Sequence, residues 1–111
     1  MNGDKTTRAD YTPRQHAENI AHWRHAAEVH AELLGQYREG ATQHMASRFQ
    51  VTPAGGWQEE EGWAETPRGE VPSLNWRCRF TNGYEVTFQS APGTFLITQD
   101  GKVIDTLLTR Y

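Results

Sequence analysis

The pattern of apolar and polar positions divides the chain into two parts, of which the first is helical. Between Ile20 and Met45 the apolar residues recur every three or four positions, which places them in one stripe along a helix. Thr12 precedes Pro13, and Gln15 follows the threonine by three residues, which is the pattern of a capping box with proline at the first helical position. The sequence therefore predicts a long amphipathic helix within residues 12–50.

The length of this helix leaves two alternatives. Gly35 and Gly40 each cost a helix about 1 kcal/mol relative to alanine. We expect either a continuous helix from Pro13 to about Arg48 or a break near Gly40 followed by a shorter second helix.

Beyond residue 72 the period becomes two, which is typical of half-buried antiparallel strands. Between Phe80 and Tyr84 a three-residue loop with Gly83 in the left-handed region would set these two aromatics opposite each other and Cys78 opposite Val86. Turn residues at 90–93 and 100–101 then separate two further strands. The prediction is an α+β fold in which one helix packs on a four-stranded antiparallel meander over residues 73–111, all within a single domain, 1–111.

The segment between these parts, residues 51–72, contains three prolines and four glycines and is predicted to be a loop that can include a short hairpin. Its stretch GWQEEEGW places two tryptophans around three glutamates. One interpretation folds the tryptophans onto the core and leaves the glutamates in solvent. The other is a protein-binding loop, since tryptophan is enriched at interfaces and clustered carboxylates attract basic surfaces. The candidate partner-binding residues are Trp57, Glu59, Glu60, Glu61, Trp63 and Glu65.

Composition narrows the classes of function. The formal net charge of −3 gives no overall field that would attract nucleic acid or an anionic membrane. Cys78 is the only cysteine, so no internal disulfide can form, and no apolar signal or membrane-spanning segment follows Met1. We therefore expect a cytoplasmic protein. The polar residues 1–11 lack periodicity and are expected to form a flexible lead-in.

Metal and catalytic chemistry find little support. Four histidines lie between His16 and His30, but they point to different sides of the predicted helix; only His22 and His25, with Glu18 one turn earlier, share a side. Zinc sites need more ligands than these, and no HExxH or CxxC motif is present. We expect neither a bound metal nor a cofactor. The stretch PAGG follows a helix rather than a strand, which disfavours a phosphate-handling enzyme.

Two arginines bear on whether the sheet binds nucleic acid. Arg77 and Arg79 project from the polar side of a predicted strand, as in some single-strand-binding sheets. In the predicted register, however, Arg79 lies opposite Glu85, which favours a cross-strand ion pair. No direct binding of nucleic acid is expected.

Two likenesses bear on function. The closing stretch TFLITQDGKVID resembles the last hairpin of nuclear-transport-factor-2-like domains. That resemblance implies a helix on a curved sheet with a small-molecule pocket or an active site, near which His30 or Asp105 would lie. In size and acidity the chain is similar to small inhibitors encoded by phages and plasmids, such as anti-CRISPR proteins.

The expectation that follows is a non-enzymatic protein-interaction module, such as an inhibitor, whose acidic loop binds a protein with a basic surface.

A homodimer is also expected. In the last hairpin Phe95 and Ile97 share one face, and neighbouring strand residues point to opposite faces. Some apolar residues of the hairpin must therefore lie on a face that a single helix leaves uncovered. This hairpin, the overhanging helix, or both would form the dimer interface. The apolar residues that cannot all share one face are Leu96, Val103, Ile104, Leu107 and Leu108.

Overall fold

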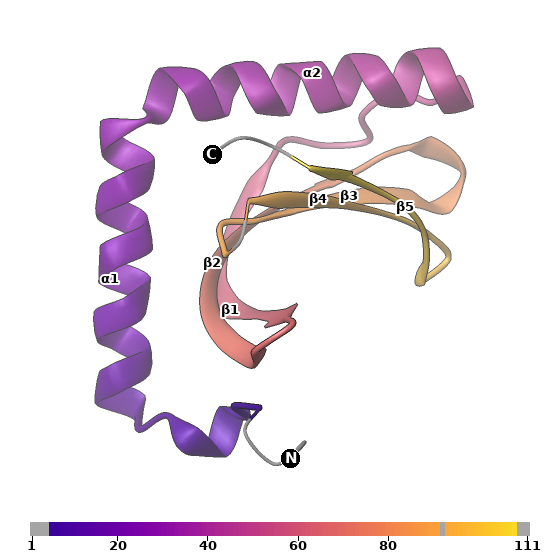
Figure 1. Ribbon diagram of the computed structural model, residues 1–111. Coiled ribbons are helices and arrows are strands. Elements are labelled where there is room, and N and C mark those ends of the chain that lie inside the picture. Colours follow the sequence, from indigo (N-terminus) through magenta and orange to yellow (C-terminus); the bar gives the residue numbers. More distant parts are fainter. Residues whose placement is uncertain (1–4, 92, 109–111) are drawn as a thin grey trace.

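The computed structural model describes residues 5–91 and 93–108 of the chain, and it has an α+β fold in which two helices precede a five-stranded antiparallel sheet (Figure 1). Short 3-10 helices occupy Arg8–Asp10 and Thr81–Gly83. The main elements are α1 (Pro13–Val29), α2 (Ala31–Phe49), β1 (Gln58–Thr66), β2 (Gly69–Arg79), β3 (Tyr84–Gln89), β4 (Thr94–Gln99) and β5 (Lys102–Leu108).

The helical region starts where the sequence predicts. The Thr12 side chain accepts a hydrogen bond from the Gln15 amide at 3.1 Å, and the Gln15 side chain accepts one from the Thr12 amide at 2.9 Å. This reciprocal pair is the predicted capping box, with Pro13 as the first helical residue. It satisfies two backbone donors that a helix start otherwise leaves unpaired.

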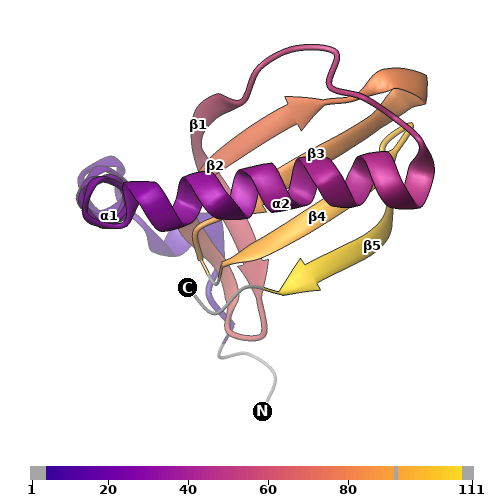
Figure 2. The same ribbon diagram turned by 90° about the horizontal axis from the view of Figure 1, so that it is seen from above.

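The predicted break near Gly40 is wrong, because the helix breaks at His30. This residue ends α1 and begins α2 with φ −107° and ψ 26°, outside the helical region, and the two helices form an L (Figure 1). Gly35 and Gly40 lie within α2, which tolerates their modest cost. The bend follows the sheet, since α1 packs beside β2, where the sheet curves (Figure 1), and α2 crosses over the other strands (Figure 2).

The prediction of four strands is also wrong, because the segment expected to be a loop contributes a fifth. Its strand β1 pairs antiparallel with β2, and the ladder runs from Gln58 opposite Arg77 to Thr66 opposite Gly69. All five strands follow each other in chain order across the sheet. The sequence does not predict β1 because its three consecutive glutamates place charged side chains on both faces of this edge strand. The alternation of apolar and polar residues that identifies a half-buried strand is therefore absent.

The register of β2 and β3 agrees with the prediction. Cys78 lies opposite Val86, and the Phe80 amide donates to the Tyr84 carbonyl at 2.8 Å across the three-residue loop. Gly83 has φ +77°, as expected, and Asn82 joins it with φ +62°. This loop turns the chain so that every apolar residue of β3 points toward the helices.

The hydrophobic core lies between α2 and the sheet. Trp57 closes its edge and contacts Phe95, with 6.3 Å between the ring centroids. The opposite face of the sheet is covered by neither helix (Figure 1). The buried members of the core are Leu34, Ala41, Met45, Val51, Cys78, Phe80, Val86, Phe88, Phe95 and Ile97.

A buried polar network joins β1 to β2 near the start of β2. Pro72 lies opposite Trp63 in the ladder. The Asn75 side chain donates to the Trp63 carbonyl at 3.2 Å, while its oxygen accepts from the Ser73 hydroxyl at 2.7 Å. The Ser90 hydroxyl lies 3.2 Å from that of Ser73 and completes the network. The Asn75 side chain thus links the backbone of β1 to Ser73 on β2.

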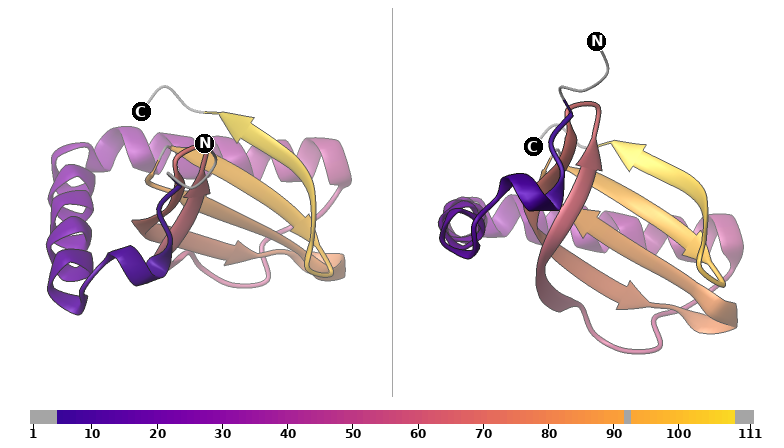
Figure 3. Two further views of the ribbon diagram at one scale, coloured as in Figure 1. Left: turned by 60° about the horizontal axis from the view of Figure 1, so that its bottom comes forward. Right: turned by 90° about the horizontal axis from the view of Figure 1, so that it is seen from below.

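Residues 5–11 of the expected lead-in lie against the β1–β2 hairpin (Figure 3). The Thr6 amide donates to the Arg68 carbonyl at 2.8 Å, and the Glu70 amide donates to the Thr6 carbonyl at 2.9 Å. Gly69 has φ +109° and lies so close to Thr6 that a side chain at residue 69 would collide with the Thr6 backbone. Residues 5–11 are therefore attached to the sheet through the backbone of Thr6.

Neither α1 nor α2 is long and apolar enough to cross a membrane.

The last hairpin presents some of the apolar surface on which the homodimer prediction rests. Val103 and Ile104 are 59% and 43% exposed, whereas Leu107 packs against the core. A register irregularity between Ile97 and Thr98 interrupts the pairing of β4 with β5. The side chain of Leu108 lies outside the described residues. A homodimer through this hairpin or through the helix stays a prediction.

Candidate functional site

The three consecutive glutamates are divided between the two faces of β1. Glu59 and Glu61 face α1, where the Arg24 Nη2 atom lies 3.5 Å and 2.8 Å from their respective carboxylates. The hydrogen bond from Arg24 to Glu61 raises the pKa of the Arg24 guanidinium above its ordinary value. Glu60 points to the opposite face and pairs with Arg77 at 3.0 Å. One arginine thus serves two carboxylates on the helical side of the strand.

An open groove of about 350 Å³ lies beside this pair, inside the elbow of the two helices. Alanine and leucine side chains of α1 and α2 form its floor. The guanidinium of Arg38 lies 5.9 Å from the centre of the Trp76 ring, a cation–π geometry. We call this site the elbow groove, and its lining residues are Arg24, Ala27, Glu28, Ala31, Leu34, Arg38, Glu59 and Trp76.

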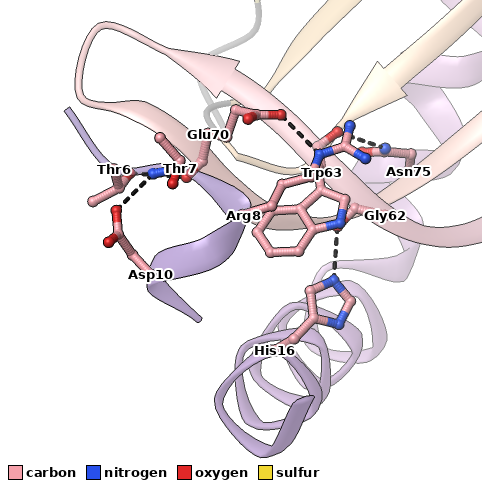
Figure 4. A network of polar contacts seen from close by, with 9 residues as sticks. All are labelled: Thr6, Thr7, Arg8, Asp10, His16, Gly62, Trp63, Glu70 and Asn75. Carbon is pink, nitrogen blue, oxygen red and sulfur yellow. Dashed lines mark hydrogen bonds and ion pairs between the residues drawn. The ribbon is translucent and has the colours of Figure 1, made fainter. Parts of the chain in front are cut away.

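Trp63 belongs to a separate cluster that fastens the N-terminal residues and α1 to the hairpin (Figure 4). Its ring contacts Tyr11 and His16 with centroid distances of 5.5 Å and 4.7 Å. The Arg8 guanidinium lies 5.5 Å from the ring centre and pairs with Glu70 at 2.8 Å. The His16 Nε2 atom donates to the carbonyl of Gly62 at 3.0 Å. These contacts give Trp63 a structural role.

The structure brings only one of the six predicted residues into the elbow groove, namely Glu59, with Glu61 adjacent through Arg24. Trp57 packs on the core and Trp63 in the hairpin cluster. Glu65 is exposed and stands opposite Glu70 in the ladder. The six residues therefore do not form one free loop, although each of the four glutamates keeps some exposure.

Sequence reasoning missed the arginines and the tryptophan of the groove. Arg24 and Arg38 appear in the sequence as ordinary polar positions of a helix, and Trp76 as a core residue of a strand. A signal existed in the small residues Ala27 and Ala31, which leave room where a larger side chain would fill the elbow. Only the bend at His30 turns that room into a groove.

The histidines and the cysteine do not form a reactive centre. His22 and His25 are exposed on α1, and within residues 5–91 and 93–108 no three or more His, Cys, Asp or Glu side chains are placed to hold a metal ion. That the protein binds no metal stays a prediction. The Cys78 thiol is 1% exposed, and its burial raises its pKa, which keeps it in the unreactive protonated form.

The two residues of the pocket-protein alternative lie apart. His30 forms the corner between α1 and α2, whereas Asp105 lies on β5 at the far edge of the sheet (Figure 2). The Asp105 carboxylate accepts from the Thr106 amide at 2.8 Å. His30 lines a shallow concave site of about 260 Å³ together with Val29, Glu32, Leu33 and Gln36, and the pocket-protein alternative stays a prediction.

No protein-family model, curated protein or solved structure matches this chain. Function therefore has to be inferred from the chemistry of its sites.

Proposed function

We propose that this protein is a non-enzymatic protein-interaction module that binds an arginine- or lysine-bearing segment of another protein in the elbow groove. The observation that carries the proposal is the shared pairing of Arg24, whose single positive charge faces the carboxylates of Glu59 and Glu61. Glu28 adds a second carboxylate to the groove lining, beside Glu59. With Glu61 counted next to the groove, three carboxylates stand against the two guanidinium groups of Arg24 and Arg38, and this excess of one negative charge favours a cationic partner.

The groove has the shape and chemistry to receive a long basic side chain. Lysine and arginine bury their aliphatic stems on apolar surface and keep the charged end near polar groups. Ala27, Ala31 and Trp76 supply the surface for the stem, and Glu28 and Glu59 supply carboxylates for the charged end. The site is thus suited to binding a cationic group rather than to catalysis.

The existing ion pairs would not prevent such an exchange. Arg24 is 40% exposed and its partners Glu59 and Glu61 are 44% and 57% exposed. Ion pairs in solvent contribute little net stability, since water and salt screen them. An incoming basic side chain can therefore replace Arg24 at one carboxylate. Binding in this way would mask a basic surface of the partner, as an inhibitor that competes with nucleic acid would do.

Charge reversal in the groove tests the proposal. The double variant Glu28→Lys/Glu59→Lys removes two attractive groups and adds two repulsive ones, so we expect at least about tenfold weaker binding of the natural partner. The partner is first purified from the native cells on the wild-type protein and identified. Its affinity for each variant is then measured at several salt concentrations.

The matched control is Glu39→Lys, which places a positive charge on an exposed position of α2 that does not line the groove. Circular dichroism and thermal unfolding establish that the variants are folded. Loss of the partner in the double variant alone supports the proposal. A partner bound equally well by the double variant and the wild type, with the same salt dependence, contradicts it.

A further inference from the structure

A second concave site lies on the side of the sheet away from α2, where the loop before β1 approaches β2. It encloses about 260 Å³ and brings two arginine side chains together with a pair of glycines. We call it the loop–strand pocket, and its lining residues are Ala54, Gly55, Gly56, Gln58, Arg77 and Arg79. The glycines belong to the PAGG stretch, for which the fold and the elbow groove supply no role.

The pocket arises because three residues stand opposite one. Gln58 is paired with Arg77, and the Ala54 amide donates to the Arg79 carbonyl at 2.8 Å. Between these two points Gly55, Gly56 and Trp57 lie opposite the single residue Cys78 and must loop outward. Trp57 turns to the core, which leaves the glycine backbone at the surface.

The glycine backbone offers unused donors. The amide groups of Gly55 and Gly56 make no hydrogen bond to any residue that the structure describes, and both residues are exposed. Neither glycine is required by conformation or packing, since φ is not positive and an added Cβ would meet no atom within 4 Å. A side chain at either glycine would therefore extend into open space.

The two arginines add forked donors beside those amides. Arg79 is 80% exposed and approaches a carboxylate only through Nε, 3.7 Å from Glu85. Arg77 lies between Glu60 at 3.0 Å and Glu85 at 3.4 Å, and its buried Nε makes no hydrogen bond. Both Nη groups of Arg79 are consequently available to a ligand. The glutamates compete with such a ligand only weakly, since exposed ion pairs are screened by water.

We propose that the loop–strand pocket binds a phosphate-sized oxyanion, either free or as the phosphate group of a small ester. Guanidinium forks pair with phosphate oxygens through parallel hydrogen bonds, and successive backbone amides in a loop form anion-binding concavities. A tetrahedral anion has enough oxygens to use both kinds of donor at once. The site faces away from the elbow groove, so it does not depend on the function proposed above.

The first test is a titration of the ¹⁵N-labelled protein with inorganic phosphate and, separately, with glycerol phosphate, followed by NMR. We expect saturable shifts of the Gly55 and Gly56 amide signals with a millimolar or tighter Kd, and tighter binding of the ester if the rest of the pocket contributes. Arg79→Gln should weaken binding at least about tenfold. Arg14→Gln is the matched control, since it removes the same charge from an exposed residue of α1.

A second pair of variants should change affinity in the opposite direction. Glu85 faces both arginines, so Glu85→Gln should bind phosphate several-fold more tightly than the wild type. Glu65→Gln removes the same charge elsewhere on the sheet and is the control. Gly56→Val should fill the pocket and weaken binding while leaving the melting temperature unchanged, because the space before Gly56 is open.

The outcomes decide the proposal. No saturable shift up to about 10 mM phosphate overturns it, as does equal loss of binding in Arg79→Gln and Arg14→Gln. Equal affinity of Glu85→Gln and Glu65→Gln also overturns it. Localised, saturable shifts with opposite effects of the arginine and glutamate variants support it. Circular dichroism confirms the fold of each variant, and the Arg79 and Glu85 variants suffice to decide if Gly56→Val fails to fold.

Discussion

The two faces of the sheet differ although the same strands build both. Along β2, Trp76 and Cys78 point toward the helices, while Arg77 and Arg79 point away from them. The first face is buried, with Phe88, Val86 and Ile97 at 1% exposure or less. The second is a network of arginine–glutamate pairs in partial contact with solvent.

This difference separates stability from binding. Apolar burial is roughly proportional to the area removed from water, so the face toward α2 supplies most of the favourable folding free energy. Exposed ion pairs supply little, and their side chains can change partners. The ligand chemistry proposed for the loop–strand pocket therefore lies on the face where exchanging contacts costs the fold least.

The largest expected effect is on the packed face. Phe88 is 1% exposed and contacts the rings of Trp76 and Phe95. Phe88→Ala should lower the free energy of unfolding by about 3–5 kcal/mol, because it removes apolar contacts and leaves a cavity. Urea unfolding measures the change. Thr87→Ala, the neighbour on the opposite face, is the control, and a loss of similar size there would contradict the comparison.

A smaller effect is expected where the second face becomes buried near the β1–β2 hairpin. Asn75 is 8% exposed and holds both the Trp63 carbonyl and the Ser73 hydroxyl. Asn75→Leu should cost about 1–3 kcal/mol, because two buried polar groups lose a partner. Thermal unfolding compares it with Gln89→Leu at the cross-strand position. Equal stability of Asn75→Leu and the wild type would show that water replaces the side chain.

The smallest effect is expected at the exposed end of the ion-pair network. Arg79 is 80% exposed and its distance to Glu85 is 3.7 Å. Arg79→Gln should change the free energy of unfolding by no more than about 0.5 kcal/mol, as is usual for surface substitutions. Urea unfolding at low and high salt is the measurement. A loss above about 1 kcal/mol would assign the network a structural role, contrary to the comparison.

Local signals predicted the parts of the fold that depend on local chemistry. The capping box at Thr12 and the loop that sets Cys78 opposite Val86 both depend on a few neighbouring residues, and both are confirmed. The helix break depends instead on how α1 and α2 follow a curved sheet. No residue pattern around His30 indicates a helix break. Gly40 has a low helix propensity, but tertiary packing overrides it and Gly40 lies within α2.

The candidate site was harder to predict for the same reason. Glu59, Glu60 and Glu61 stand in the sequence as one acidic group, but a strand sends alternate side chains to opposite faces. Recognising β1 in the sequence would have separated Glu60 from its neighbours. The arginines that receive these carboxylates, Arg24 and Arg77, are set by tertiary pairing and carried no local signal.

The order of the strands has a consequence for how the chain folds. Every ladder joins strands that are neighbours along the chain, so the meander can form hairpin by hairpin with short loop closures. The contact of Thr6 with Arg68 spans 62 residues and requires the β1–β2 turn to exist beforehand. Closing so long a loop carries a larger entropic cost than forming a hairpin. We therefore expect residues 5–11 to dock late in folding and to detach early when the native state opens locally.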